Sequence, residues 1–169
     1  MKNGIISAVV SLALGYAAAV AAQERLVRFE GGIGVIPVSR AAGTQNADGT
    51  FPNVVRNDVR GTAPGGQPWV ISRLSADVMT DGRISVDGRG LLLAGGDTIG
   101  TNGNQFVRAK LFCGSADPLL SDLVRLEANG DFRIEGFLKG TTLPTSCETP
   151  VLLIVNADGR WFAAGIQKL

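Results

Sequence analysis

The stretch that decides the fold is Gln105-Phe106-Val107-Arg108-Ala109-Lys110-Leu111-Phe112-Cys113-Gly114. Alternate positions carry the side chains best suited to a buried face, namely Val107, Ala109, Leu111 and Cys113. The positions between them make up the opposite face, namely Phe106, Arg108, Lys110 and Phe112. A period of two is typical of a β-strand with one buried face, so we expect a strand here whose first set points inward.

Three turn signals divide the rest of the chain into similar alternating runs. Asp81-Gly82, Asn129-Gly130 and Asn156-Ala157-Asp158-Gly159 each separate two such runs. Asp-Gly and Asn-Gly favour tight hairpin turns, because their backbones accept positive φ angles. We therefore expect three β-hairpins. The glycines of Gly31–Gly34 indicate a bend or bulge in an extended N-terminal segment.

About eight strands with regular turn signals and no helix of normal length predict an all-β fold. The architecture we expect is an antiparallel β-sandwich of Greek-key or jelly-roll type, and the alternative is a small β-barrel. The expected runs outside the opening stretch are Arg25–Phe29 and Val35–Val38 as one extended segment broken at the glycines, then Val54–Val59, Trp69–Met79, Arg83–Asp87 with Gly90–Leu93 as its continuation or a further strand, Leu123–Glu127, Phe132–Leu138, Val151–Val155 and Arg160–Ile166.

Three local features have more specific interpretations. In Trp69–Met79 the alternation places Val70 on one face with Leu74, Ala76 and Val78. Ala116–Asp122 contains a proline, and we expect one helical turn or an exposed loop there. In the last strand Trp161 and Phe162 point to opposite faces, so we expect one in the core and the other at an edge or facing a partner.

The N-terminal residues 1–22 have the pattern of a signal peptide. Lys2 is followed by the apolar run Ile5–Leu14 and by small residues that suit cleavage before Gln23. The alternative is a retained membrane anchor, but the apolar run is shorter than the roughly 20 residues that span a bilayer. We expect residues 23–169 to form one domain, and no later run is long enough to span a membrane.

The exported chain is expected to be electrically neutral. Loss of Lys2 leaves 15 of the 16 Lys and Arg residues, against 15 Asp and Glu. No basic excess remains to attract nucleic acid or an anionic membrane surface. We therefore expect neither as a partner.

Cys113 and Cys147 are the two cysteines of the chain. Cysteines of exported proteins commonly form disulfides, so we predict a bond between them, the alternative being two buried free thiols. The loop that such a bond closes corresponds to about 4 kcal/mol in the chain-entropy description.

Histidine is absent from the sequence. This excludes Ser-His-Asp and Cys-His catalysis and histidine-ligated metals. Gly95–Thr101 has two glycines near phosphate-loop spacing but lacks the lysine and the helix that follows it. We expect no cofactor and no metal site, although the oxygen-rich loops leave calcium as an alternative.

Acidic residues alone could support a glycosidase, which needs two carboxylates facing one another in a cleft. Asp77, Asp87 and Asp97 are the candidates for this rival hypothesis. The simpler interpretation is that these carboxylates are solvated.

A glycan-binding site is the other candidate, because sugars pack on aromatic rings and hydrogen-bond to amides and carboxylates. Trp69 follows a loop rich in proline and glycine, and the polar loop Gly95–Gln105 supplies Asp97, Asn102 and Asn104. These four residues are the predicted binding residues, provided that the fold brings the two loops together. The alternative is a core tryptophan and a solvated loop.

Several stretches resemble a group of small exported bacterial proteins of uncharacterised function. They are Phe29-Glu30-Gly31-Gly32-Ile33-Gly34-Val35-Ile36-Pro37-Val38, the run Asp81–Gly114, and Pro150–Ile166. The resemblance implies a shared domain and bacterial export. It implies no activity, ligand or functional residue.

Together these observations favour a secreted or periplasmic protein that binds a ligand or associates with a surface without catalysis. A glycan or an envelope protein is the expected partner. The two alternatives are a hydrolase that uses carboxylates alone and a structural subunit that associates through strand edges.

Overall fold

The computed structural model describes residues 24–41, 44–48 and 55–169, and these form strands and no helix. The predicted signal peptide, residues 1–22, lies outside the described residues. The strands are β1 (Arg25–Gly34), β2 (Ser39–Ala41), β3 (Val55–Arg56), β4 (Trp69–Val70), β5 (Arg73–Met79), β6 (Arg83–Arg89), β7 (Leu92–Leu93), β8 (Phe106–Phe112), β9 (Leu119–Leu120), β10 (Val124–Arg125), β11 (Phe132–Phe137), β12 (Val151–Asn156) and β13 (Trp161–Gln167).

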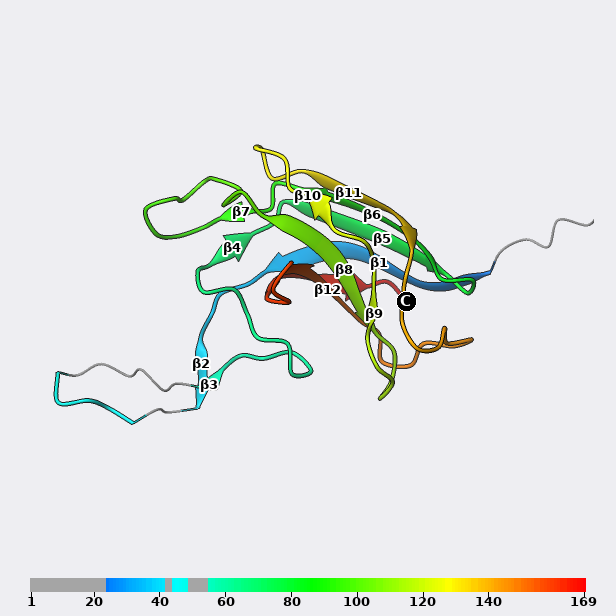
Figure 1. The fold of residues 1–169 in the computed structure, drawn as a ribbon, viewed down its shortest axis with the longest axis horizontal. Coiled ribbons are helices and arrows are strands. Elements are labelled where there is room, and N and C mark those ends of the chain that lie inside the picture. Colours follow the sequence, from blue (N-terminus) through cyan, green and yellow to red (C-terminus); the bar gives the residue numbers. More distant parts are fainter. Residues whose placement is uncertain (1–23, 42–43, 49–54) are drawn as a thin grey trace, which may run out of the picture.

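One antiparallel sheet contains most of these strands, in the order β10-β8-β12-β13-β1-β5-β6-β11, with β9 also paired to β8. Figure 1 shows this sheet curling until β10 lies beside β11, so that it forms a half-barrel. Hydrogen bonds between Leu120 and Lys139 join the two edges farther along. The predicted all-β antiparallel class is confirmed, and the curled sheet is consistent with both a sandwich and a barrel-like fold.

The strand that opened the sequence analysis has the predicted inward face. Val107, Ala109 and Leu111 are fully buried, and Cys113 is 8% exposed. Phe112 was expected to point outward into solvent but is buried as well, because Arg60 and Lys110 lie over its ring. The predicted disulfide between Cys113 and Cys147 is present, and it fixes the end of β8 to the segment before β12.

Two of the three predicted hairpins form antiparallel pairs, β5 with β6 and β12 with β13, the second with a register shift between Ile154 and Val155. The third prediction was partly wrong. A turn forms at Asn129-Gly130, but β10 pairs with β8 and β11 pairs with β6, at opposite edges of the sheet. The predicted glycine bulge is present as a register shift in β1 between Phe29 and Gly32.

The expected strand Trp69–Met79 is divided into β4 and β5. Leu74 is buried as predicted, but Val70 is 49% exposed and Trp69 is buried instead. The alternation is broken because β4 leaves the main sheet and pairs with β7. The prediction of a helical turn or exposed loop at Ala116–Asp122 was also wrong in part, because Leu119 is buried in β9 against β8.

The segment before β4 covers the outer face of the sheet. Its backbone hydrogen-bonds to Trp161 on both sides, through Ala63 O and Gly65 N–H, and Thr62 accepts a hydrogen bond from Lys110 Nζ. This cover explains why both Trp161 and Phe162 are buried, where we expected only one of them to be.

The site described below depends on a close approach between β1 and β4. Trp69 N–H donates to Val35 O at 2.8 Å. A Cβ atom added to Gly34 would lie 2.1 Å from Trp69 O and 2.7 Å from Val70 Cα. Both are backbone atoms, which cannot turn aside as a flexible side chain can. Glycine at this position therefore lets β4 pack directly against the end of β1.

We predict that Gly34→Ala lowers the free energy of unfolding by about 1–3 kcal/mol, the usual cost of overpacking. The matched control is Gly66→Ala, because a Cβ atom there meets nothing within 4 Å. Urea unfolding of both variants measures the effect. Equal stability of the two variants would contradict the close approach.

Candidate functional site

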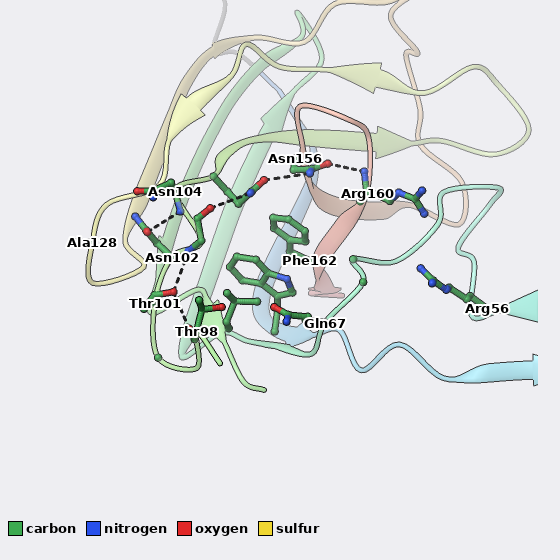
Figure 2. Close-up of a pocket in the computed structure, with 17 residues that line it drawn as sticks. Arg56, Gln67, Thr98, Thr101, Asn102, Asn104, Ala128, Asn156, Arg160 and Phe162 are labelled. Carbon is green, nitrogen blue, oxygen red and sulfur yellow. Dashed lines mark hydrogen bonds between the residues drawn. The ribbon is translucent and has the colours of Figure 1, made fainter. Parts of the chain in front are cut away.

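A pocket of about 970 Å³ lies where three segments meet. They are the segment Gly65–Gln67 before β4, the loop Thr98–Gln105 before β8, and the turn between β12 and β13, which includes Asn156 and Arg160. Figure 2 shows their side chains arranged around Phe162. The fold thus brings together the two loops that the sequence analysis proposed as a binding site.

Two aromatic side chains form the floor of the pocket. The Trp69 and Phe162 rings stack with centroids 4.0 Å apart and an interplanar angle of 12°. Each of the two residues is only 4% exposed, so the pair is not the open aromatic plane that the glycan hypothesis anticipated. A Cβ atom on Gly65 would lie 3.0 Å from two Phe162 ring carbons and 3.3 Å from Trp69 Nε1. Glycine at this position lets the chain pass directly over the stacked rings.

Asn102 holds one wall of the pocket in place. Its Nδ2 donates to Leu126 O at 2.9 Å and to Glu127 O at 3.0 Å, and its Oδ1 accepts from the Asn104 N–H at 3.0 Å. Its amide hydrogens and its oxygen all have partners in the protein. Asn102 is therefore a structural residue of the wall, although it lines the pocket as predicted.

Asn156 and Gln105 connect the loop before β8 to the turn between β12 and β13. Asn156 Nδ2 donates to Gln105 Oε1 at 3.2 Å, and Asn156 Oδ1 accepts from the Arg160 N–H at 2.9 Å. Gln105 Nε2 in turn donates to Gly103 O at 3.1 Å. From the sequence, Asn156 was interpreted as the start of a hairpin turn. Asn156 is only 7% exposed, and its side chain connects the residue before β13 to the loop before β8.

Four of the amide and guanidinium side chains of the pocket have no such structural role. Within the described part of the chain, the side chains of Gln67, Asn104, Arg56 and Arg160 make no hydrogen bond or ion pair, and all four residues are exposed. A Cβ atom on Gly96 would lie 2.4 Å from Gln67 Nε2, so the glutamine side chain passes closely over this glycine. Together with the hydroxyl group of Thr98, which lines the pocket and is exposed, these four groups have hydrogen-bonding capacity left for a ligand.

The four predicted binding residues therefore have different places. Trp69, Asn102 and Asn104 line the pocket. Asp97 is exposed in the same loop as Asn104 but does not line it. Gln67, Arg56 and Arg160 were not predicted as site residues, and no spacing in the sequence links their three segments. Only the pairing of distant strands places them around one hollow.

The carboxylates of the rival hydrolase hypothesis lie elsewhere. Asp77 is ion-paired with Arg25 at 2.8 Å, in a strand position that pairs with Ser85. Asp87 is ion-paired with Arg89 on its own strand at 2.8 Å, and pairs across strands with Arg133. No aspartate or glutamate is among the described residues that line the pocket.

Arginines hold Asp87 in its ionised form. Hydrogen bonds from Arg89, at 2.8 Å to each carboxylate oxygen, lower the pKa of Asp87, and a weaker contribution comes from Arg133. A general acid needs a raised pKa, which is the opposite shift. Among the described residues, no three or more histidine, cysteine, aspartate or glutamate side chains are grouped as metal ligands.

The chain matches no protein-family model, no curated protein and no solved structure. The described residues contain no helix with the length and apolar character required to cross a membrane.

We predict that Asp87 titrates below the ordinary aspartate pKa of about 3.9. Because its pKa is lowered in the folded state, its contribution to stability is complete above the unfolded pKa and is lost as the pH falls through the folded pKa. Carboxyl-carbon NMR measures the midpoint, which Arg89→Gln should raise and Arg125→Gln should leave unchanged. An ordinary or raised midpoint in the unaltered protein would contradict the ion-pair assignment.

Proposed function

We propose that the chain is an exported, non-catalytic binding protein whose ligand is a polar, hydroxyl-rich molecule of the glycan class. The single observation that carries this proposal is the pocket itself. It combines an aromatic floor with exposed side chains that have no partner among the described residues. Ligand sites are typically concave, with an apolar surface and a few convergent polar groups.

The hydrogen-bonding groups of the pocket suit hydroxyl groups. The amides of Gln67 and Asn104 each offer both a donor and an acceptor, as a sugar hydroxyl does. Because Trp69 and Phe162 are nearly covered by each other and by the chain, we assign them the shape of the floor rather than broad stacking with a sugar ring. The affinity then comes mainly from the polar groups at the walls.

Binding is favoured over hydrolysis because the hydrolase needs carboxylates beside the substrate. Asp77 and Asp87 are engaged by arginines away from the pocket, and Asp97 lies outside the lining. The structural-subunit alternative needs free strand edges. The two edge strands β10 and β11 instead lie close to each other.

Export to the periplasm or the outside of a bacterium is part of the proposal. The signal-like residues 1–22 and the resemblance to exported bacterial proteins support it. So does the Cys113–Cys147 disulfide, because disulfides persist in oxidising compartments.

The test is titration of the protein with a panel of neutral and acidic oligosaccharides by isothermal calorimetry. At least one should bind, and the double variant Gln67→Ala/Asn104→Ala should weaken its binding about tenfold, as expected for the loss of two hydrogen bonds. The matched control is Gln167→Ala, an exposed amide that does not line the pocket.

Two results would overturn the proposal. One is a panel in which no oligosaccharide binds. The other is binding that survives the double variant unchanged, since the ligand would then lie elsewhere. Unfolding curves of each variant distinguish lost binding from lost structure.

A further inference from the structure

The charged side chains of the pocket are of one sign. Arg56, at the end of β3, and Arg160, directly before β13, are the only charged residues among the described residues that line it. Neither guanidinium has an ion-pair partner within the described part of the chain. By contrast, Arg89 on the outer face of the sheet is paired with both Asp87 and Asp131.

Both arginines lie at the same end of the pocket. Figure 2 shows Arg160 and Arg56 on one side of Phe162, and Thr98, Asn102 and Asn104 on the other. The pocket thus has a cationic end and an amide end, with the aromatic floor between them. A ligand long enough to touch both ends would meet different chemistry at each.

Hydrogen bonds hold the backbone of both arginines in place. The Arg160 N–H donates to Asn156 Oδ1 at 2.9 Å, and the Arg56 carbonyl accepts from the Asp58 N–H at 2.9 Å. Asn57 anchors the chain beside Arg56, because its side chain bonds to the backbone of both Ile36 and Val38. The guanidinium groups themselves remain open to solvent.

The nearest carboxylates in sequence do not line the pocket. Asp58 follows Arg56 by two residues, and Asp158 precedes Arg160 by two. Asp158 lies 3.4 Å from Asn156 Nδ2, on the turn between β12 and β13. Within the described part of the chain, Asp158 forms no ion pair with either arginine.

We infer that the ligand of this pocket is an acidic saccharide, with a carboxylate held at the Arg56 and Arg160 end and hydroxyl groups held by Asn104 and Gln67. This inference rests on the proposed function and narrows its ligand class. A guanidinium presents parallel N–H donors that match the two oxygens of a carboxylate, and it also binds sulfate and phosphate esters. The overall charge of the chain conceals this local excess, because acidic residues elsewhere cancel it.

The experiment compares uronic-acid oligosaccharides with the same molecules after reduction of their carboxyl groups to alcohols. Galacturonate, glucuronate and mannuronate oligosaccharides serve as probes, and sulfated neutral oligosaccharides test the other anionic group. We expect the best uronate to bind about tenfold more tightly than its reduced form, as charge-assisted hydrogen bonds allow. We also expect its affinity to fall as sodium chloride is raised, because salt screens exposed charges.

Substitutions of the two pocket arginines test whether their charges contribute to uronate binding. Arg56→Gln and Arg160→Gln should each weaken uronate binding several-fold and should weaken binding of the reduced oligosaccharide much less, because only the charge-assisted part of the contact is lost with the carboxylate. Arg73→Gln is the matched control, since it removes the same charge from an exposed arginine outside the pocket. It should affect neither probe.

The outcomes separate the two proposals. If reduced and acidic forms bind equally, the acidic class is wrong and the proposed glycan binding stands. If Arg73→Gln acts as strongly as the pocket variants, the carboxylate is not held at the Arg56 and Arg160 end, and the inference is wrong. Preference for the sulfated probe over every uronate overturns the assignment to a carboxylate. If no oligosaccharide binds, both proposals fall.

Discussion

The stacking of Trp69 on Phe162 is the contact on which the candidate site depends. It joins β4, which has left the main sheet, to β13, which lies near the centre of that sheet. An aromatic pair of this kind contributes about 0.5–1.5 kcal/mol beyond the burial of its surface. Glycine at position 34 permits the contact, because a Cβ atom there would collide with the backbone of β4, and glycine at position 65 leaves room for the chain above the rings. The floor of the pocket is therefore formed by contacts within the protein itself.

The amides around this floor have two separate roles. Asn102, Gln105 and Asn156 use their side chains to hold loops together, so they maintain the shape of the walls. Gln67 and Asn104 keep their side-chain groups available to a ligand. This division matters for interpreting substitutions, because loss of a bracing amide alters the pocket through its shape, and loss of an available amide alters the contact alone.

Much of the fold could be predicted from local pattern, and the site could be predicted only in part. Alternation in the stretch around Val107 and the Asp-Gly and Asn-Gly turns identified the strands, and the two cysteines identified the disulfide. The pairing of β10 with β8 and of β11 with β6 could not be predicted. A turn signal does not specify which distant strand each of the two strands beside the turn will pair with. Arg56 and Arg160 were missed for the same reason, since they meet only through long-range pairing.

The most direct test of the central claim is the NMR signal of the two tryptophan side chains during titration with a bound oligosaccharide. Trp69 lies under the pocket, and Trp161 lies beneath the segment that precedes β4. If the pocket above the stacked rings is the binding site, the indole N–H resonance of Trp69 will shift with saturation while that of Trp161 stays in place. Saturable binding that leaves the Trp69 resonance unmoved, or that moves only Trp161, would contradict the account.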